Sequence, residues 1–217
     1  MREADISVIV IAKEPVPGRV KTRLCPPCTP AQAARLAEAA LRDTLAAAGA
    51  ASVGRRVLAL DGRPGDWMPA GWDVIGQRGD GLDERLAAAF ADVGGPALLV
   101  GMDTPQLTGE ALRAATGALL EPGCDAVLGP TLDGGYWTVG LRAPRADAFV
   151  GVPMSRADTC DRQHARLLGL GLRVTTLGVL RDIDTFADAR AVAERHPSGA
   201  FAVAMDDLRR ATAASAA

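Results

Sequence analysis

The chain has 217 residues and a formal net charge of −2; 48% of the residues are hydrophobic and 23% are charged. This length favours one α/β domain over two, and the composition excludes disordered and fibrous proteins. The longest apolar runs are shorter than the roughly 20 residues that span a bilayer, and Met1 to Asp5 lack the plan of a signal peptide. We therefore expect a cytoplasmic protein with neither a membrane nor a nucleic-acid partner.

The first predicted strand leads directly into a basic loop. Ile6 to Ala12 form an almost unbroken β-branched run, which suits a strand buried on both faces. Pro15 and Pro17 cannot continue that strand, and Gly18 lets the backbone approach a ligand closely. A solvated charge run is the alternative interpretation of the loop. We favour phosphate binding, and assign to it Lys13, Gly18, Arg19, Lys21, Thr22 and Arg23.

This loop matches neither of two common nucleotide motifs. Val20 stands before Lys21-Thr22 where a P-loop requires glycine, and the chain contains no G-x-G-x-x-G. The nearby Cys25 and Cys28 form a C-x-x-C pair, but no second such pair exists to complete a zinc site. We interpret the cysteines as free thiols.

Strands and helices then alternate. Thr29, Pro30 and Gln32 predict a capped helix that runs to about Ala48. Short strands are predicted at 57–60 and 72–75, followed by a Gly-rich loop and a helix that reaches about residue 92. Acidic residues at this helix start disfavour a phosphate there, so we assign Gly79 and Asp80 to a neutral part of a nucleotide. An ordinary capped helix is an equally good interpretation.

The clearest later strand, 96–103, brings Asp103 to the edge of the sheet where α/β proteins bind ligands. Thr108 caps the next predicted helix. A strand at 125–129 precedes Asp133-Gly134-Gly135-Tyr136, which is either a hairpin turn before the strand at 137–141 or a mobile substrate loop. A helix at 159–169 and a strand at 172–177 follow. Asp182-Ile183-Asp184 then leads into a helix capped by Thr185.

This alternation predicts one α/β domain, residues 1–197, with a mostly parallel sheet covered on both sides. The tail, residues 198–217, has Phe201, Met205 and Leu208 at helical spacing. We expect it to pack on the body or on a second subunit, which makes a homodimer possible.

The cations and acids suggest a common ligand. A Mg²⁺ ion, or Mn²⁺ in its place, binds one or two carboxylates together with substrate phosphates. Such an ion would join the basic loop to the acids that follow two later strands. The reaction class implied is transfer at a nucleotide phosphate or at an activated sugar.

Four motifs carry a family resemblance. They are Ala12-Lys13-x-Pro15-x-Pro17-Gly18-x-x-Lys21-Thr22-Arg23-Leu24, Gly101-x-Asp103-x-Pro105, Asp133-Gly134-Gly135-Tyr136 and Asp182-Ile183-Asp184-Thr185. The chain resembles the bacterial transferases known as radical-SAM- or selenodomain-associated glycosyltransferases, within the nucleotide-diphospho-sugar transferase superfamily. It is also similar to the 2-phospholactate guanylyltransferases of coenzyme F420 biosynthesis.

The resemblance implies a GT-A-like three-layer fold. It implies that the basic loop covers the nucleotide phosphates, that Asp103 and Asp184 bind the metal, and that the acceptor lies near Asp133 to Tyr136 and Ser155. The chain departs from the family pattern at Thr104, where a cysteine is commoner, and at Met154-Ser155-Arg156, where Trp-Ser-Thr is expected. These departures indicate an atypical acceptor.

Three functions follow from these observations. A nucleotidyltransferase would use a nucleoside triphosphate and a small phosphorylated or phosphonate acceptor, with Lys21 and Arg23 as catalytic residues holding the leaving pyrophosphate. A glycosyltransferase would use a nucleotide-sugar and expel a nucleoside diphosphate. A non-catalytic nucleotide-binding module is the third. Four cations in one loop favour the first.

Overall fold

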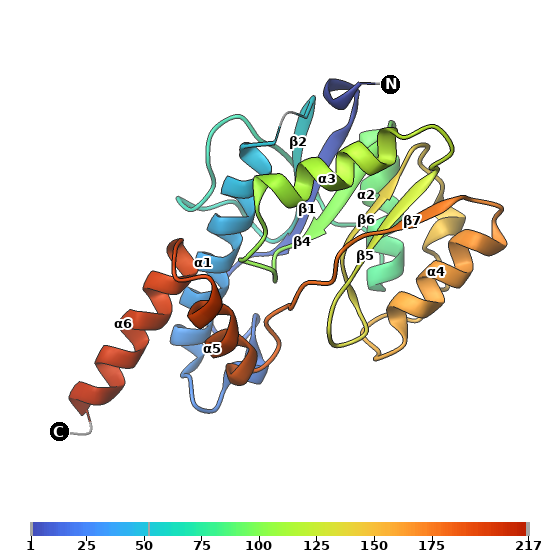
Figure 1. Cartoon of the computed structure of the whole chain (residues 1–217). Helices are drawn as coiled ribbons and strands as arrows, with labels where there is room; N and C mark the ends of the chain where they lie inside the picture. Colours follow the sequence, from blue (N-terminus) through green and yellow to red (C-terminus); the bar gives the residue numbers. More distant parts are fainter. Residues whose placement is uncertain (1, 52, 216–217) are drawn as a thin grey trace.

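The computed structural model describes residues 2–51 and 53–215. Its centre is a seven-stranded sheet in the order β3-β2-β1-β4-β6-β5-β7 (Figure 1). The strands are β1 (Ser7–Lys13), β2 (Arg55–Asp61), β3 (Asp73–Gly76), β4 (Ala97–Gly101), β5 (Ala126–Pro130), β6 (Tyr136–Leu141) and β7 (Val174–Thr176). All neighbouring strands are parallel except β6, which is antiparallel to both β4 and β5.

Helices cover both faces of this sheet. They are α1 (Pro30–Gly49), α2 (Leu82–Val93), α3 (Gly109–Leu120), α4 (Thr159–Gly169), α5 (Phe186–Arg195) and α6 (Ala200–Ser215). Helices α1 and α3 contribute to the core on one face, and α2 and α4 contribute to the core on the other. Short 3₁₀ turns lie at Glu3–Asp5 (η1), Thr22–Leu24 (η2) and Ala146–Ala148 (η3).

Alternation within the strands explains why the sheet is buried on both faces. In β1, Val8 and Val10 point into the α1/α3 core, whereas Ile9 between them points into the α2/α4 core. Side chains of a strand point to opposite faces in turn, so a continuous β-branched run fills two cores at once. Val8, Ile9 and Val10 are fully buried.

The helix boundaries follow the capping signals in the sequence. The hydroxyl of Thr29 accepts from Gln32 N at 3.2 Å, and Thr29 N donates to the Gln32 side chain at 2.7 Å. A second capping box joins Thr185 and Asp188. Thr108 caps α3 by accepting from Ala111 N. The caps predicted at Thr29, Thr108 and Thr185 are therefore confirmed, whereas α2 begins after Gly81 without a side-chain cap.

The strands differ from expectation mainly at their ends. β4 stops at Gly101, so Asp103 lies in the turn after the strand and not at its last residue. β7 covers only Val174–Thr176 of the predicted 172–177, since it pairs with β5 alone at the sheet edge. These shifts leave the order of the elements unchanged.

The final helix packs on the outside of the body. Phe201 and Met205 of α6 lie in a third core with Leu36 of α1 and Val192 of α5, and Asp43 accepts hydrogen bonds from the first N–H groups of α6 at 2.8 Å. The far end of α6 points away from the sheet (Figure 1). Met1 of the predicted domain and residues 216–217 of the predicted tail lie outside the described residues. None of the described helices combines the length and apolar character that a membrane crossing needs.

Candidate active site

The order of the strands creates a crevice beside β1. The chain passes from β1 to β2 and β3 on one side, then returns to place β4 on the other side of β1. In open α/β sheets ligands bind at such a switch point, outside the carboxyl ends of the strands. A cleft of about 850 Å³ opens there, and Lys13 at the end of β1 and Asp103 after β4 both line it.

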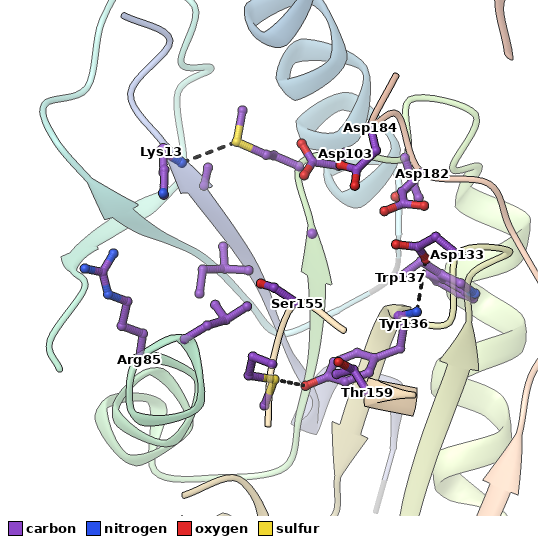
Figure 2. A pocket seen from close by; sticks show the side chains of 18 of the residues that line it. Lys13, Arg85, Asp103, Asp133, Tyr136, Trp137, Ser155, Thr159, Asp182 and Asp184 are labelled. Atoms are coloured by element: carbon purple, nitrogen blue, oxygen red, sulfur yellow. Dashed lines mark hydrogen bonds between the residues drawn. The ribbon is translucent and has the colours of Figure 1, made fainter. Parts of the chain in front are cut away.

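Most residues predicted for the site line this one cleft. They are Lys13, Arg19, Lys21, Thr22, Arg23, Asp80, Asp103, Asp133, Gly135, Tyr136, Ser155 and Asp184. The predicted residues outside the lining are Gly18, Gly79 and Gly134. Figure 2 shows Asp103, Asp133, Asp182 and Asp184 gathered on one side of the cleft, with Lys13 and Arg85 opposite them.

The basic loop turns two of its cations toward the acids. The Lys21 Nζ lies 2.9 Å from the Asp103 Oδ1 and 4.0 Å from the Asp184 Oδ1, and it donates a hydrogen bond to the Ile183 carbonyl. The Arg23 Nη1 lies 2.6 Å from the Asp184 Oδ2. Lys21 is enclosed, with its side chain 9% exposed, whereas the Arg23 side chain is 71% exposed. The residues predicted to bind phosphate therefore also contact the residues predicted to bind metal.

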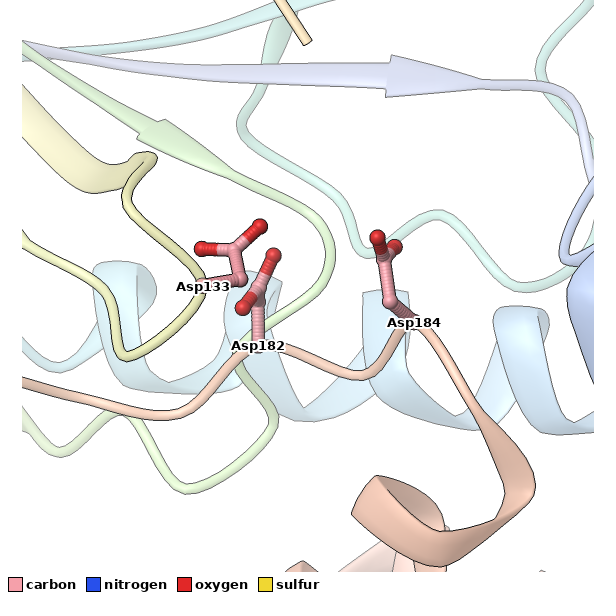
Figure 3. Close-up of side chains that lie close together, drawn as sticks. All are labelled: Asp133, Asp182 and Asp184. Atoms are coloured by element: carbon pink, nitrogen blue, oxygen red, sulfur yellow. The ribbon is translucent and has the colours of Figure 1, made fainter. Parts of the chain in front are cut away.

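The closing acidic motif gains its geometry from one buried residue. Ile183 is 1% exposed in the third core, and its N–H donates to the Asp103 carbonyl at 2.9 Å. Ile183 points into that core, while Asp182 and Asp184 on either side of it both line the cleft (Figure 3). The turn after β5 brings Asp133 to the same place. One oxygen from each of Asp133, Asp182 and Asp184 lies within 4.8 Å of the others.

This clustering affects ionisation. Burial, together with the carboxylates of Asp133 and Asp184, raises the pKa of Asp182 to about 6. The family resemblance assigns Asp184 to the metal and gives Asp182 no role, yet both line the cleft. The D-I-D spacing was the signal for including both, because it is the period of an extended segment.

The donor set suits a hard divalent cation. Carboxylate and carbonyl oxygens are the ligands that Mg²⁺ and Mn²⁺ prefer. Asp103, Asp184 and the Ile183 carbonyl already surround one positive charge, the Lys21 ammonium. A metal ion is therefore chemically compatible with these residues.

The Asp133-Gly134-Gly135-Tyr136 segment is a pinned hairpin turn between the antiparallel strands β5 and β6. The Gly134 carbonyl accepts from Cys160 N at 2.8 Å, and the Asp133 carboxylate accepts from the Thr131 hydroxyl at 2.6 Å and from Gly135 N at 3.0 Å. A Cβ on Gly134 would lie 1.9 Å from the Ala157 carbonyl oxygen. Of the two sequence interpretations, the hairpin turn is the one the structure adopts.

Two predicted acceptor residues have different surroundings. The Tyr136 hydroxyl lies 3.7 Å from the Met154 sulfur and 3.4 Å from Gln163 Oε1, and burial raises the pKa of this phenol. Tyr136 thus stays neutral and offers no base. Ser155 has a left-handed backbone with φ of 57°, at the middle of the loop before α4. Arg156 beside it also lines the cleft and was missed as a site residue in the sequence.

One backbone N–H group just before α2 is hydrogen-bonded within the protein. Asp80 N donates to the Glu84 carboxylate at 2.8 Å, so this N–H is not offered to a ligand. Two further lining residues were missed in the sequence, Gln77 and Arg85. Gln77 Nε2 binds the carbonyls of Ala12 and Ala59 at 2.8 and 2.9 Å, which ties the Gly-rich loop to β1 and β2. Glutamine and arginine are common in loops, so neither carried a signal of its own.

Comparison with known protein families shows which family the chain belongs to. The model of the family described as "Uncharacterized protein conserved in bacteria (DUF2064)" matches residues 34–156, more than half of the chain. The chain belongs to the DUF2064 family. No curated protein matches it.

Several solved structures are similar in fold to this member of the DUF2064 family. A protein from Desulfovibrio desulfuricans G20, provisionally named a nucleotide-diphospho-sugar transferase, is 25% identical, with a TM-score of 0.83 over 94% of this chain and 95% of that one. Rv0371c from Mycobacterium tuberculosis H37Rv, solved in complex with manganese, is 22% identical, with a TM-score of 0.56 over 88% and 98%. The 2-C-methyl-D-erythritol 4-phosphate cytidylyltransferase from Thermus thermophilus is 16% identical, with a TM-score of 0.56 over 92% and 98%. The expected GT-A-like fold is confirmed.

Proposed function

We propose that this protein is a Mg²⁺- or Mn²⁺-dependent nucleotidyltransferase, which transfers a nucleoside monophosphate from a nucleoside triphosphate to a small phosphorylated or phosphonate acceptor and releases pyrophosphate. The observation that carries the proposal is that Lys13, Arg19, Lys21 and Arg23 line one cleft with Asp103 and Asp184. Expulsion of pyrophosphate builds negative charge on two phosphates, and several cations lower its cost. A divalent ion held by the acids would neutralise part of that charge.

Each part of the cleft has a distinct role in this mechanism. Asp103 and Asp184 would hold the metal, and Asp182 lies close enough to Asp184 to assist. Lys21 and Arg23 bind the leaving pyrophosphate, while Lys13 lies on the opposite side of the cleft from the acids (Figure 2). The enzyme acts mainly by positioning the α-phosphate for in-line attack.

The acceptor enters on the side of Ser155 and the β5–β6 turn. Arg156 lines the cleft beside Ser155 and suits an anionic acceptor. Tyr136, whose pKa is raised by burial, cannot serve as the general base near neutral pH. An acceptor that is already ionised, such as a phosphate, needs no such base. This is why we propose a phosphorylated or phosphonate acceptor.

The comparisons support the proposal in general terms. The Thermus thermophilus relative in fold is named as a cytidylyltransferase, and the Rv0371c structure contains manganese. At these identities the likeness concerns the fold, so the residues of the cleft carry the functional argument. The resemblance to radical-SAM-associated transferases and to 2-phospholactate guanylyltransferases remains part of the same proposal.

Glycosyl transfer from a nucleotide-sugar is the second candidate. It is favoured by the provisional name of the Desulfovibrio desulfuricans protein, which matches nearly the whole chain. It is also favoured by the pairing of Lys21 and Arg23 with acids. Cations that are paired with acids are less available to a leaving group, and expulsion of a nucleoside diphosphate needs fewer cations than expulsion of pyrophosphate.

Paired release assays distinguish the two reactions. The protein is incubated with each of the four nucleoside triphosphates, Mg²⁺ and a panel of phosphorylated acceptors, and pyrophosphate is measured with a coupled assay. A parallel series with nucleotide-sugars measures nucleoside diphosphate. Asp103→Asn is the control for contaminating activity. We expect release of pyrophosphate in the first series, and we expect Asp103→Asn to abolish that release. Nucleoside diphosphate without any pyrophosphate would reject nucleotidyl transfer in favour of glycosyl transfer.

A further inference from the structure

The ammonium of Lys21 occupies a cation site made of oxygens. Its Nζ lies 2.9 Å from the Asp103 Oδ1 and 4.0 Å from the Asp184 Oδ1, and it donates to the Ile183 carbonyl. The side chain is 9% exposed. A lysine side chain ordinarily keeps its charged end in water, so this enclosure is unusual for a residue in a surface loop.

The backbone that carries the oxygens around Lys21 is held in place independently of it. The Ile183 N–H donates to the Asp103 carbonyl at 2.9 Å, and the Ile183 side chain is buried. This bond ties the turn after β4 to the segment before α5. The backbone would therefore keep Asp103 and Asp184 beside each other if the ammonium left, and two carboxylates would then face the same small space.

These are also oxygens that a divalent ion in the proposed site would use. Oxygens contact Mg²⁺ at about 2.1 Å, so an ion bound to Asp103 and Asp184 would lie within a few ångströms of the present Nζ position. Like charges at such a distance repel strongly. The ion and the ammonium cannot share the site, so one must displace the other.

The backbone of Lys21 is suited to such a displacement. Its φ is 48°, a left-handed conformation that costs a non-glycine residue about 1 kcal/mol. It stands before the short η2 turn, at the end of an irregular loop, and Leu24 anchors the far end of that turn by full burial. The lysine can thus swing while the turn stays attached to the body.

We propose that Lys21 is an internal counter-ion that holds the place of the metal until metal and nucleotide bind. Entry of the metal moves the ammonium into the cleft, where the phosphates of the nucleotide accept it. This inference rests on the proposed function, and it explains how one lysine both contacts the metal ligands and serves the phosphates. Its consequence is that Lys21 competes with the metal when no anion is present, so metal and anion bind cooperatively.

The test measures Mn²⁺ binding to the intact chain by electron paramagnetic resonance, without any nucleotide. Lys21→Met removes the charge and keeps the length of the side chain. Lys21→Arg keeps a charge. Lys13→Met is the matched control, because Lys13 lines the same cleft and is exposed at its surface. Thermal unfolding of each variant confirms that it folds.

We expect Lys21→Met to bind Mn²⁺ about 10-fold more tightly than the wild type, the size of a typical coupling between sites. Lys21→Arg and Lys13→Met should stay within about 2-fold of the wild type on the same scale. Unchanged or weaker Mn²⁺ binding by Lys21→Met would overturn the inference, as would an equal gain by Lys13→Met.

Failure of the inference is distinguishable from failure of the proposed function. If Lys21→Met and the wild type bind Mn²⁺ equally, and Asp103→Asn removes that binding, then Lys21 is no counter-ion but the metal site remains. If Mn²⁺ binds to none of the proteins even with a nucleoside triphosphate present, the metal site itself is wrong, and the inference falls with it.

Discussion

Asp103 and Asp184 face each other across the Lys21 ammonium, in the position the proposal gives to the metal. We predict that Asp103→Asn and Asp184→Asn each weaken Mn²⁺ binding at least about 10-fold in the presence of a nucleotide, because an amide lacks the charge that offsets dehydration of the ion. Calorimetric titration measures this. Asp66→Asn is the control, since Asp66 is exposed and does not line the cleft. Wild-type affinity in Asp103→Asn would remove that residue from the site.

Asp182 gives a prediction that depends on pH. Its pKa in the folded state is raised to about 6 by burial and by neighbouring carboxylates, above about 3.9 in the unfolded chain. The folded state therefore binds this proton more tightly, and ionised Asp182 destabilises the fold above pH 6. The pKa difference corresponds to about 3 kcal/mol, which solvent screening of a partly exposed carboxylate reduces. Without metal, Asp182→Asn should therefore stabilise the protein by about 2 kcal/mol at pH 8, an advantage that fades as pH falls from 6 to 4.

Thermal unfolding at a series of pH values checks this prediction, with the exposed Asp66→Asn as control. An Asp182→Asn variant that is less stable than the wild type at pH 8, or whose advantage does not change with pH, would contradict it. A stabilising substitution in a cleft is also what a functional site predicts, because such sites retain unfavourable charge for their ligands.

The turn of the β5–β6 hairpin gives a prediction about stability. Gly134 has a φ of 89°, and a Cβ there would meet the Ala157 carbonyl at 1.9 Å. Gly71 has a similar φ of 81° with no atom within 4 Å of its Cβ position. Both alanine variants share the cost of left-handed backbone, about 1 kcal/mol. Gly134→Ala should therefore lower the melting temperature by several degrees more than Gly71→Ala, because only Gly134→Ala must also push the turn away from the loop before α4.

Differential scanning calorimetry of the two variants is the measurement. Equal losses would show that the turn does not depend on the close contact with Ala157, and would restore the interpretation of this segment as a mobile substrate loop.

Helices and strands were the part of the fold that could be predicted best from the sequence, because the sequence signals for them are local. The Thr29 and Thr185 capping boxes predict where their helices begin. The Asp133 to Tyr136 turn could not be decided in this way. What fixes it is the Cys160 N–H on the Gly134 carbonyl, a contact between segments that no local pattern reports.

The whole molecule explains why the site was predictable only in part. Cations after β1 and acids after β4 could be expected at one edge of a parallel sheet, since carboxyl ends of parallel strands share that edge. That Lys21 bonds to Ile183, 162 positions away, depends on how the closing segment packs against the turn after β4. Likewise Gln77 and Arg85 enter the site through side-chain reach, which strand order does not determine.

The central claim, that the cleft transfers a nucleoside monophosphate, is tested most directly with a nucleoside triphosphate labelled at the α-phosphate or at the γ-phosphate. We predict that α-label appears on a phosphorylated acceptor while γ-label appears in pyrophosphate. We also predict that Arg23→Ala slows this transfer about 100-fold, the effect of roughly 3 kcal/mol of lost transition-state stabilisation. Transfer of the γ-label to the acceptor, or label transfer that is indifferent to Arg23→Ala, would contradict it.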